Sequence, residues 1–222
     1  MALLGSAIVF ILFDRAPGTL EDFYAWHDRE HMPERLGIPG FFRGRRYHVV
    51  GAGPQFLTLY EALDIDVLVG SEYMQRLNNP TILSRKIGPL ARNNSRGVCR
   101  ILKSIARNPS GSTIALLRFS CTDPSNLDEC LNSLEPSFRT TNGLYGVHWC
   151  DTNKLASTIE VEEKKNREIC IPESIILVEG NQVKTVLSTA NEIVRACKSI
   201  SDQLIHDTQI STYSLEVTHL PK

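Results

Sequence analysis

The sequence lacks the short motifs that would identify its chemistry directly. It has no glycine-rich phosphate loop, no G-x-G-x-x-G fingerprint and no G-x-S-x-G elbow, so nothing in it predicts a nucleotide-binding site or an α/β-hydrolase serine. It also lacks an excess of charge, since 24 basic residues are balanced by 25 acidic ones in 222 residues. This balance predicts neither a nucleic-acid partner nor an anionic membrane surface as partner. We therefore predict a protein that works without a cofactor.

Paired cysteines and long apolar spans are also missing. The six cysteines, at positions 99, 121, 130, 150, 170 and 197, contain no C-x-x-C pair. That pattern argues against a disulfide framework or a zinc site and indicates buried free thiols in a reducing cytosol. Residues 2–13 are nearly all apolar, but they lack a preceding basic region and are shorter than the ~20 residues that span a bilayer. We interpret them as a buried strand of a cytoplasmic protein.

The sequence contains the same order of predicted elements twice. Apolar runs, turn residues and helical spacing predict strand, helix, strand, strand, helix, strand in each half. In the first half these are residues 7–13, 19–33, 41–50, 56–63, 67–77 and 97–105. In the second half they are residues 112–121, 124–138, 143–150, 174–180, 183–204 and 210–219. This order is the ferredoxin-like split βαβ motif, so we predict two halves, 1–106 and 112–222, joined by a linker at 107–111.

The repetition predicts how the two halves pack. One ferredoxin-like sheet carries both helices on one face, and its other apolar face needs a partner, which a second copy in the same chain supplies. We predict an α+β fold in which tandem ferredoxin-like halves form one barrel. Two independent domains are the alternative, which the short linker disfavours. The polar stretch at 153–170, rich in Glu and Lys, is predicted to be an exposed loop or hairpin extension.

Residues 22–47 resemble a known family. They read DFYAWHDREHMPERL at 22–36, IPGF at 38–41 and RGRRY at 43–47, and this pattern is similar to the dimeric α+β barrel superfamily, in particular its EthD-like members. The segments LYE at 59–61, NNPT at 78–81 and RG at 96–97 fit the same pattern. The resemblance covers about residues 6–105, whereas the second half matches in element order alone and is interpreted as a diverged repeat.

The resemblance implies a small-molecule cavity between the sheet and the helices, lined by the first helix and the inner face of the hairpin. Similar barrels include cofactor-free monooxygenases, isomerases, lactone-forming enzymes, dehydratases and decarboxylases of polyketide pathways, and haem-binding enzymes. Because one fold hosts so many reactions, the resemblance is more informative about the site than about the activity. The helix histidine that recurs in the family corresponds to His31.

Two histidines are the candidates for catalysis. His27 and His31 are four residues apart, so they share one face of a helix, with Glu30 adjacent. Residues 27–31 match the H-x-x-E-H zinc pattern, but no third ligand can be assigned and we predict no metal. The alternatives are general acid/base catalysis near neutral pH, with Glu30 or a backbone carbonyl orienting the imidazole, and capping of the helix C-terminus.

Five other residues are candidates for binding a substrate. Trp26 either stacks on a planar substrate or packs in the core. Tyr60 either donates a hydrogen bond to the substrate or packs. Arg45 is expected to point into the cavity and, with Tyr47, to stabilise an oxyanion; the alternative for this arginine is solvation at a sheet edge. His148 aligns with Arg45 in the repeat, and therefore predicts a second, pseudo-symmetric site.

These residues and the family resemblance together predict a cofactor-independent enzyme, and the resemblance implies a lyase or isomerase of secondary metabolite biosynthesis. His31, with His27, would act as general acid and base in the isomerisation, cyclisation, dehydration or decarboxylation of a polyketide-like or cyclic metabolite. The alternatives are a cofactor-free or haem-dependent monooxygenase of the same fold, and a non-catalytic ligand-binding protein. We expect a small molecule as partner, and the sequence is compatible with a homodimer.

Overall fold

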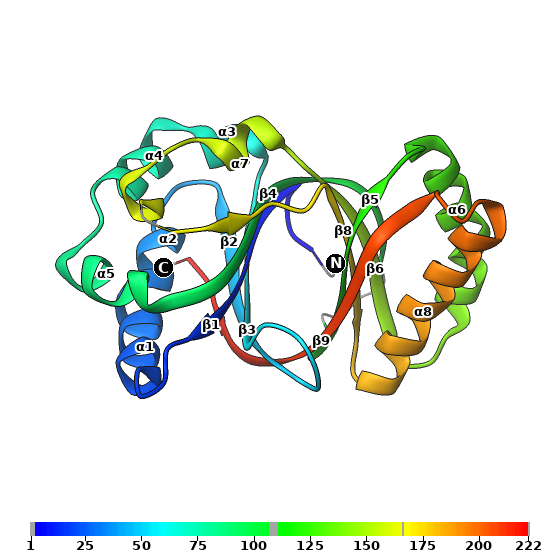
Figure 1. The fold of residues 1–222 in the computed structure, drawn as a ribbon, viewed down its shortest axis with the longest axis horizontal. Helices are drawn as coiled ribbons and strands as arrows, with labels where there is room; N and C mark the ends of the chain where they lie inside the picture. The colour runs from blue at the N-terminus through cyan, green and yellow to red at the C-terminus, as the bar shows by residue number, and fades with distance from the viewer. Residues whose placement is uncertain (1–2, 107–110, 166, 222) are drawn as a thin grey trace.

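The computed structural model describes residues 3–106, 111–165 and 167–221, and within these ranges eight strands close into one antiparallel barrel (Figure 1). Around the barrel the strands follow the order β1, β3, β2, β9, β5, β8, β6, β4, and β4 pairs with β1 to close it. A short strand, β7, lies parallel to β4. The bounds are β1 Ala7–Arg15, β2 Phe41–Val49, β3 Phe56–Ala62, β4 Ala91–Ala106, β5 Thr113–Cys121, β6 Leu144–Thr152, β7 Ile169–Cys170, β8 Ser174–Gly180 and β9 Ile205–His219.

Both halves of the chain contribute to this barrel. The ladders β2–β9 and β4–β6 each join a strand of the first half to a strand of the second. The register agrees with the predicted repeat, because Tyr60 of β3 pairs with Val9 just as Val178 of β8 pairs with Ala115. The predicted α+β fold, in which tandem ferredoxin-like halves form one barrel, is confirmed. Apart from Gly111, the predicted linker lies outside the described residues.

Short, interrupted helices cover the first half. The first helix continues past Pro33, one of its two predicted ends, and stops at Leu36, directly before the other predicted end at Gly37. Pro33 is tolerated because the π turn just before it already interrupts the regular pattern of helix hydrogen bonds. The helix predicted at 67–77 is divided in two by Gly70, whose backbone is extended. The bounds are α1 Leu20–Trp26, the π-helical turn η1 His27–His31, α2 Met32–Leu36, α3 Ile65–Val69, α4 Ser71–Asn78, α5 Ile82–Ile87 and the 3₁₀ turn η2 Gly88–Leu90.

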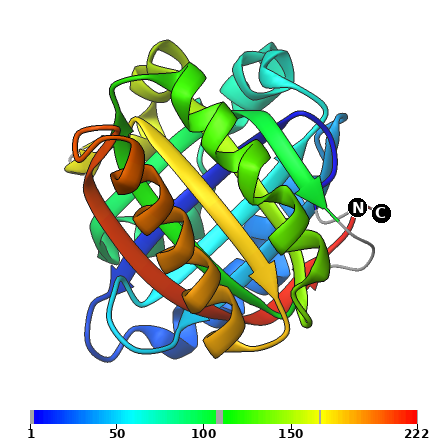
Figure 2. The same ribbon diagram turned by 90° about the vertical axis from the view of Figure 1, so that its right-hand side faces the viewer.

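Two long helices cover the second half. α6 (Pro124–Thr140) and α8 (Val183–Ile200) lie side by side across the outer face of the sheet (Figure 2). α8 ends at Ile200 rather than at the predicted residue 204, and β9 begins earlier than predicted, at Ile205. Apolar side chains fill the layer between helices and sheet, among them Leu127, Leu131, Trp149, Ile176, Val178 and Ile193. Within the described ranges, none of the helices is long and apolar enough to cross a membrane.

The polar stretch after β6 packs against the first half, so the prediction of an exposed loop is wrong. It forms α7 (Lys154–Thr158), the 3₁₀ turn η3 (Glu162–Lys164) and β7, and it reaches over the side of the barrel that carries α3 and α4 (Figure 1). The backbone N–H of Val98 on β4 donates to Ser157 Oγ at 2.9 Å. Apolar residues interspersed among the charged ones, Ala156, Ile159 and Val161, join the core of the first half.

A charged cluster lies inside the barrel among apolar side chains. Glu61 of β3 and Glu179 of β8 occupy equivalent positions, and both are 0% exposed. Arg43 and Arg45 pair with Glu61 at 2.8 and 3.0 Å, and Arg45 also forms an ion pair with Glu179. His148 Nε2 lies 3.7 Å from Glu179 Oε2. A buried arginine requires such a carboxylate partner, and here the partners come from both halves of the chain.

Candidate functional site

A cavity lies between the sheet and the helices of the first half. Its volume is about 100 Å³, comparable with the ~150 Å³ cavity that accepts benzene in an engineered protein core. β1, β3 and β4 form its floor, and α1, the π turn and α4 form its walls. One side is covered by four residues of the polar insertion, Glu163, Lys164, Arg167 and Ile169. Several walls are aromatic, including Phe13, Phe23, Trp26 and Tyr73. The volume and these walls suit a compound with a single planar ring.

The π-helical turn brings the two histidines together. The N–H of Met32 donates to the carbonyl oxygen of His27, five residues back, and this wider turn keeps His27 and His31 on one side of the helix. Their ring centroids are 5.6 Å apart and the rings are nearly parallel, at 27°. The predicted shared face is therefore confirmed. The alternative in which the histidines cap a helix C-terminus is wrong, because the helix continues for five residues.

A glycine on β2 allows this helix to approach the sheet closely. A Cβ atom added at Gly44 would lie 2.8 Å from Met32 Cε and 3.1 Å from Tyr60 Cε1. A larger residue at this position would therefore require the terminal methyl group of Met32 and the Tyr60 ring to shift. Met32 is fully buried directly after the π turn, so it packs between this turn and β2.

Arg46 determines the tautomer of His27. Arg46 Nη1 lies 2.9 Å from His27 Nδ1, and a guanidinium can only donate a hydrogen bond. Nδ1 must therefore accept, which places the proton of the neutral imidazole on Nε2. Arg46 is held in turn by ion pairs with Asp28 and with Glu216, the latter at 2.8 Å. Burial, with the positive charge of Arg46, holds the pKa of His27 well below 6.5, so His27 is a neutral hydrogen-bond donor.

His31 is placed differently, beside a carboxylate that comes from the second half. Its Nδ1 lies 3.9 Å from Glu163 Oε1 in η3, and Arg35 Nη2 holds Glu163 at 2.8 Å. Nδ1 has no hydrogen-bond partner among the described residues, and the nearby negative charge of Glu163 favours a proton on this nitrogen, which leaves the lone pair on Nε2. Burial, followed by the charges of Arg35 and Arg167, keeps the pKa of His31 well below 6.5. His31 is therefore unprotonated at neutral pH and available as a base.

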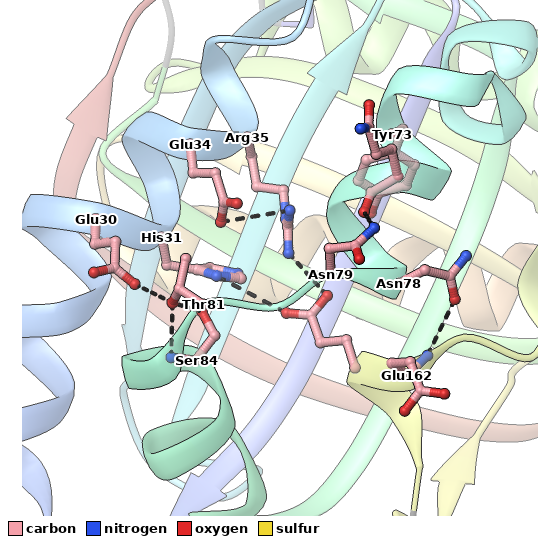
Figure 3. A network of polar contacts seen from close by, with 12 residues as sticks. Glu30, His31, Glu34, Arg35, Tyr73, Asn78, Asn79, Thr81, Ser84 and Glu162 are labelled. Carbon is pink, nitrogen blue, oxygen red and sulfur yellow. Dashed lines mark hydrogen bonds and ion pairs between the residues drawn. The ribbon is translucent and has the colours of Figure 1, made fainter.

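Glu30 does not take part in this arrangement. Thr81 donates its hydroxyl hydrogen to the Glu30 carboxylate (Figure 3). The expectation that Glu30 orients an imidazole is therefore wrong, and Glu163 occupies that place. Trp26 Nε1 donates to Ser84 Oγ at 3.1 Å, and the Trp26 ring lies 4.4 Å from the His31 ring between centroids. Trp26 therefore lines the cavity and also packs in a core cluster with Phe23, and its contact with a substrate stays a prediction.

Two hydroxyl groups on β3 add polar atoms to the cavity. Tyr60 and Thr58 both line it, and neither hydroxyl oxygen has a hydrogen-bond partner among the described residues. Burial raises the pKa of Tyr60, so the phenol stays protonated and can donate. A buried hydroxyl without a partner is costly, and a ligand oxygen would remove that cost. Tyr60 therefore lies where the prediction placed it, whereas Thr58 was missed.

Arg45, Tyr47 and His148 do not line the cavity, and their predicted positions are wrong. All three side chains lie inside the barrel, on the opposite face of the sheet from the helices. Arg45 is neutralised there by Glu61 and Glu179, and His148 Nδ1 lies 2.8 Å from Ser104 Oγ. In this fold both faces of the sheet are buried, so strand alternation separates two sets of residues without telling which one faces the helices.

A metal or a haem does not fit the cavity. In the described parts of the chain, no group of three or more His, Cys, Asp or Glu side chains is placed to hold a metal ion. A cavity of about 100 Å³ is too small for a porphyrin. His27 Nδ1 is already engaged by Arg46, and the rings of Trp26 and His27 pack on either side of His31. We therefore derive no chemistry through either group.

Comparison with known proteins identifies the fold. No family model and no curated protein matches the sequence. A solved anthrone oxidase-like protein aligns with a TM-score of 0.65 at 12% identity, over 99% of this chain and 95% of its own. A putative monooxygenase from Lactobacillus acidophilus aligns with a TM-score of 0.57 at 10% identity, over 97% of both chains. A haem-binding protein from Thermus thermophilus aligns with a TM-score of 0.57 at 11% identity, over 96% and 92%.

These identities are too low to transfer an activity, but the alignments extend over almost the whole chain and almost the whole of each neighbour. They agree with the strand order and with the pairing of the two halves. The chain therefore has the fold of the dimeric α+β barrel superfamily, with both halves of the barrel on one polypeptide.

Proposed function

We propose that the first-half cavity catalyses proton transfer on a small, planar, enolisable metabolite. His31 Nε2 removes a proton from a carbon next to a carbonyl group, and His27 Nε2–H donates a hydrogen bond to the oxygen on which negative charge develops. Tyr60 supplies a second donor to that oxygen. The observation that carries this proposal is the hydrogen bond from Arg46 to His27 Nδ1, because it gives two neighbouring, neutral histidines opposite roles.

Glu163 supports the step at His31. Once His31 has taken the proton it is an imidazolium, and the carboxylate 3.9 Å from Nδ1 stabilises the new positive charge. His31 Nε2 can then return the proton to another carbon or to a leaving group. Isomerisation, cyclisation, dehydration and decarboxylation all begin or end with such a transfer, so the proposal is a lyase or isomerase that needs no bound cofactor.

Oxygenation is a second candidate. A carbanion formed by His31 could react with molecular oxygen instead of being reprotonated. Two of the structural neighbours are described as an anthrone oxidase-like protein and a putative monooxygenase, and this is the observation that favours the second candidate. Proton removal by His31 is the first step in both, so the two candidates differ only in what the carbanion meets next.

Deuterium exchange tests the shared step without knowledge of the natural substrate. The probes are single-ring enolisable ketones and 1,3-diones, incubated in D₂O and followed by NMR, with oxygen uptake measured in parallel. We expect His31→Gln to slow exchange at least ~100-fold, the usual contribution of a general base. His206→Gln, on β9 and outside the cavity lining, is the matched control. Unchanged exchange in folded His31→Gln would contradict the proposal.

The same experiment separates the remaining alternatives. Oxygen uptake that disappears in His31→Gln would favour oxygenation over isomerisation. A probe that raises the melting temperature of the wild-type protein, but exchanges no deuterium and consumes no oxygen, would favour a ligand-binding protein over an enzyme.

A further inference from the structure

The cavity carries an excess of positive charge. Among the described residues that line it, five side chains are cationic and one is a carboxylate. The carboxylate, Glu163, already accepts a hydrogen bond from Arg35 at 2.8 Å. The cations are Arg15 on β1, Arg35 on α2, Arg96 on β4, and Lys164 and Arg167 in the polar insertion.

Several of these cations have a nitrogen atom without a hydrogen-bond partner among the described residues, although Arg35 Nη1 lies 3.7 Å from Glu34 Oε2. Arg96 is 9% exposed and Arg35 is 2% exposed, and an Nη1 atom of each has no hydrogen-bond partner among the described residues. The same holds for Nε of Arg15 and Nε of Arg167. Arg96 keeps one bond, from Nη2 to Tyr73 Oη at 3.2 Å. Buried guanidinium groups without partners are costly, so these donors require an acceptor.

The titration behaviour of the cluster agrees with this geometry. Burial and the nearby Arg167 lower the pKa of Arg15 to about 10. Burial and the nearby Arg96 lower the pKa of Lys164 to about 8. The cations therefore repel one another in a partly dry space, and an anion placed among them would relieve that repulsion.

Inside the barrel, a buried arginine is neutralised by carboxylates of the protein itself. Arg45 is 1% exposed, and it has carboxylates of Glu61 and Glu179 within ion-pair distance. In the cavity, Arg35 has the carboxylates of Glu34 and Glu163 as ion-pair partners, whereas Arg96 has a phenol as its hydrogen-bond partner. The contrast between Arg45 and Arg96 indicates that the counterion of Arg96 comes from outside the chain.

The polar insertion from the second half packs closely against this site. A Cβ atom added at Gly88 would lie 2.2 Å from Arg167 Nη2, so the glycine at this position leaves room for the guanidinium. Lys164 Nζ donates to the carbonyl oxygens of Ser157 and Ile159, at 2.9 and 2.7 Å, which fixes the turn that carries the cations. The second half therefore contributes directly to the first-half cavity.

We propose that the cavity binds an organic anion, a single-ring compound with a carboxylate group, with Arg96 and Arg167 holding the carboxylate. The ring lies against Trp26 and the aromatic walls, where the two histidines reach it. This deepens the proposed function by naming its substrate class, and it rests on that function only for the statement that the ligand reacts. The planar guanidinium groups match a carboxylate in shape and charge, and the aromatic walls favour a ring over an inorganic anion.

Calorimetric titration of the whole protein tests the proposal, with three probes of defined chemistry. Benzoate carries the ring and the charge, benzamide carries the ring without the charge, and inorganic phosphate carries charge without the ring. We expect benzoate to bind at least ~10-fold more tightly than either of the other two, from one or two charge-assisted hydrogen bonds. Equal affinity for benzoate and benzamide, or for benzoate and phosphate, would overturn the proposal.

Variants locate the binding site and separate it from the catalytic proposal. Arg96→Gln and Arg167→Gln should each weaken benzoate binding at least ~10-fold and leave benzamide binding unchanged. Arg195→Gln, an exposed arginine on α8, is the matched control. Arg167 is less buried than Arg96, so it remains testable if Arg96→Gln fails to fold, and unaltered benzoate affinity in folded Arg167→Gln would contradict the assignment. Benzoate has no enolisable carbon, so its affinity tests the anion site separately from proton transfer, and a failure of deuterium exchange would not count against the anion site.

Discussion

The two helix layers of this protein rest on equivalent strands but are built differently. In the second half, long helices pack on an apolar floor that includes Ile176 and Val178. In the first half, the equivalent floor positions hold Thr58 and Tyr60, whose hydroxyl groups lack partners among the described residues. The strand register is therefore the same in both halves, and the side chains at these floor positions decide whether the helices pack on a filled core or enclose a cavity.

This difference shows which part of the molecule stabilises the fold and which part carries the site. Buried polar groups without partners lower stability, and a cavity loses packing contacts. A protein can keep both only when other regions compensate. Here the filled second-half layer and the interior cluster around Glu61 and Glu179 provide the compensation.

We expect the largest loss of stability from breaking the charged cluster inside the barrel, to which both halves contribute. Glu179→Gln removes a charge from the interior and leaves Arg45 without one of its two carboxylates. We expect a loss of about 3–5 kcal/mol in the free energy of unfolding, the usual result of breaking a buried pair. Denaturant unfolding measures it, and Glu173→Gln, which removes an exposed partner of Lys154, should change stability by less than ~0.5 kcal/mol. Equal effects of the two substitutions would show that the interior cluster is unimportant.

Placing a first-half residue in the second half should have the next largest effect. Val178→Tyr copies Tyr60 into the filled layer, where Val178 is 0% exposed. Overpacking and an unpaired hydroxyl together should cost about 3 kcal/mol. Thermal unfolding measures the loss. A variant as stable as the wild type would mean that the second layer also contains space for a ring, and the comparison between the layers would fail.

The pH dependence of stability should also separate the halves. In the folded state burial keeps the pKa values of His27 and His31 well below 6.5, whereas in the unfolded chain they bind protons near that pH. Stability is therefore complete above pH ~6.5 and falls as the pH drops below it, with each histidine contributing up to ~1.4 kcal/mol per pH unit. His27→Gln should reduce the slope of unfolding free energy against pH by up to ~1.4 kcal/mol per pH unit, the contribution of one histidine. Parallel stability curves for the variant and the wild type, between pH 6.5 and 5, would contradict the buried neutral histidine.

The smallest expected change in stability is at Tyr60 itself. Tyr60→Phe removes a hydroxyl that has no partner among the described residues, so stability should change by less than ~0.5 kcal/mol. Deuterium exchange into the enolisable probes should nevertheless slow at least ~10-fold, because one donor to the oxyanion is lost. A large loss of stability would instead show that this hydroxyl is satisfied within the folded protein.

Much of the fold could be predicted from the sequence because its signals are local. Apolar runs and turn residues located the strands, and the repeated order of elements led to one barrel. The insertion was missed because Val161 and Ala156 are isolated among charged residues, and their burial depends on contacts with the distant core of the first half. Gly70 was missed as a helix break for a related reason, since an isolated glycine is often tolerated within a helix.

The candidate site could be predicted only in part. Trp26, His27 and His31 follow from helical spacing and from a short motif, and the structure places all three at the cavity. Arg45 was chosen over Arg46 because strand alternation cannot tell the interior of a barrel from the face under the helices. Glu163 was missed, as were the cations of the cavity, Arg35, Arg96, Lys164 and Arg167, because the tertiary fold alone brings their segments together.

The π-helical turn makes the site depend on the number of residues as well as on their identity. The turn spans His27–His31, and relative to a regular helix it holds one additional residue. Deleting the exposed Arg29 would return the turn to regular α-helical pitch and leave the residues after it near their present orientation. His27 and His31 would then be three residues apart, which separates them by about 60° around the helix axis, although no residue that lines the cavity had been replaced. Substitution scanning would not detect this sensitivity, and homologous chains that differ by one residue in this segment should not share the site.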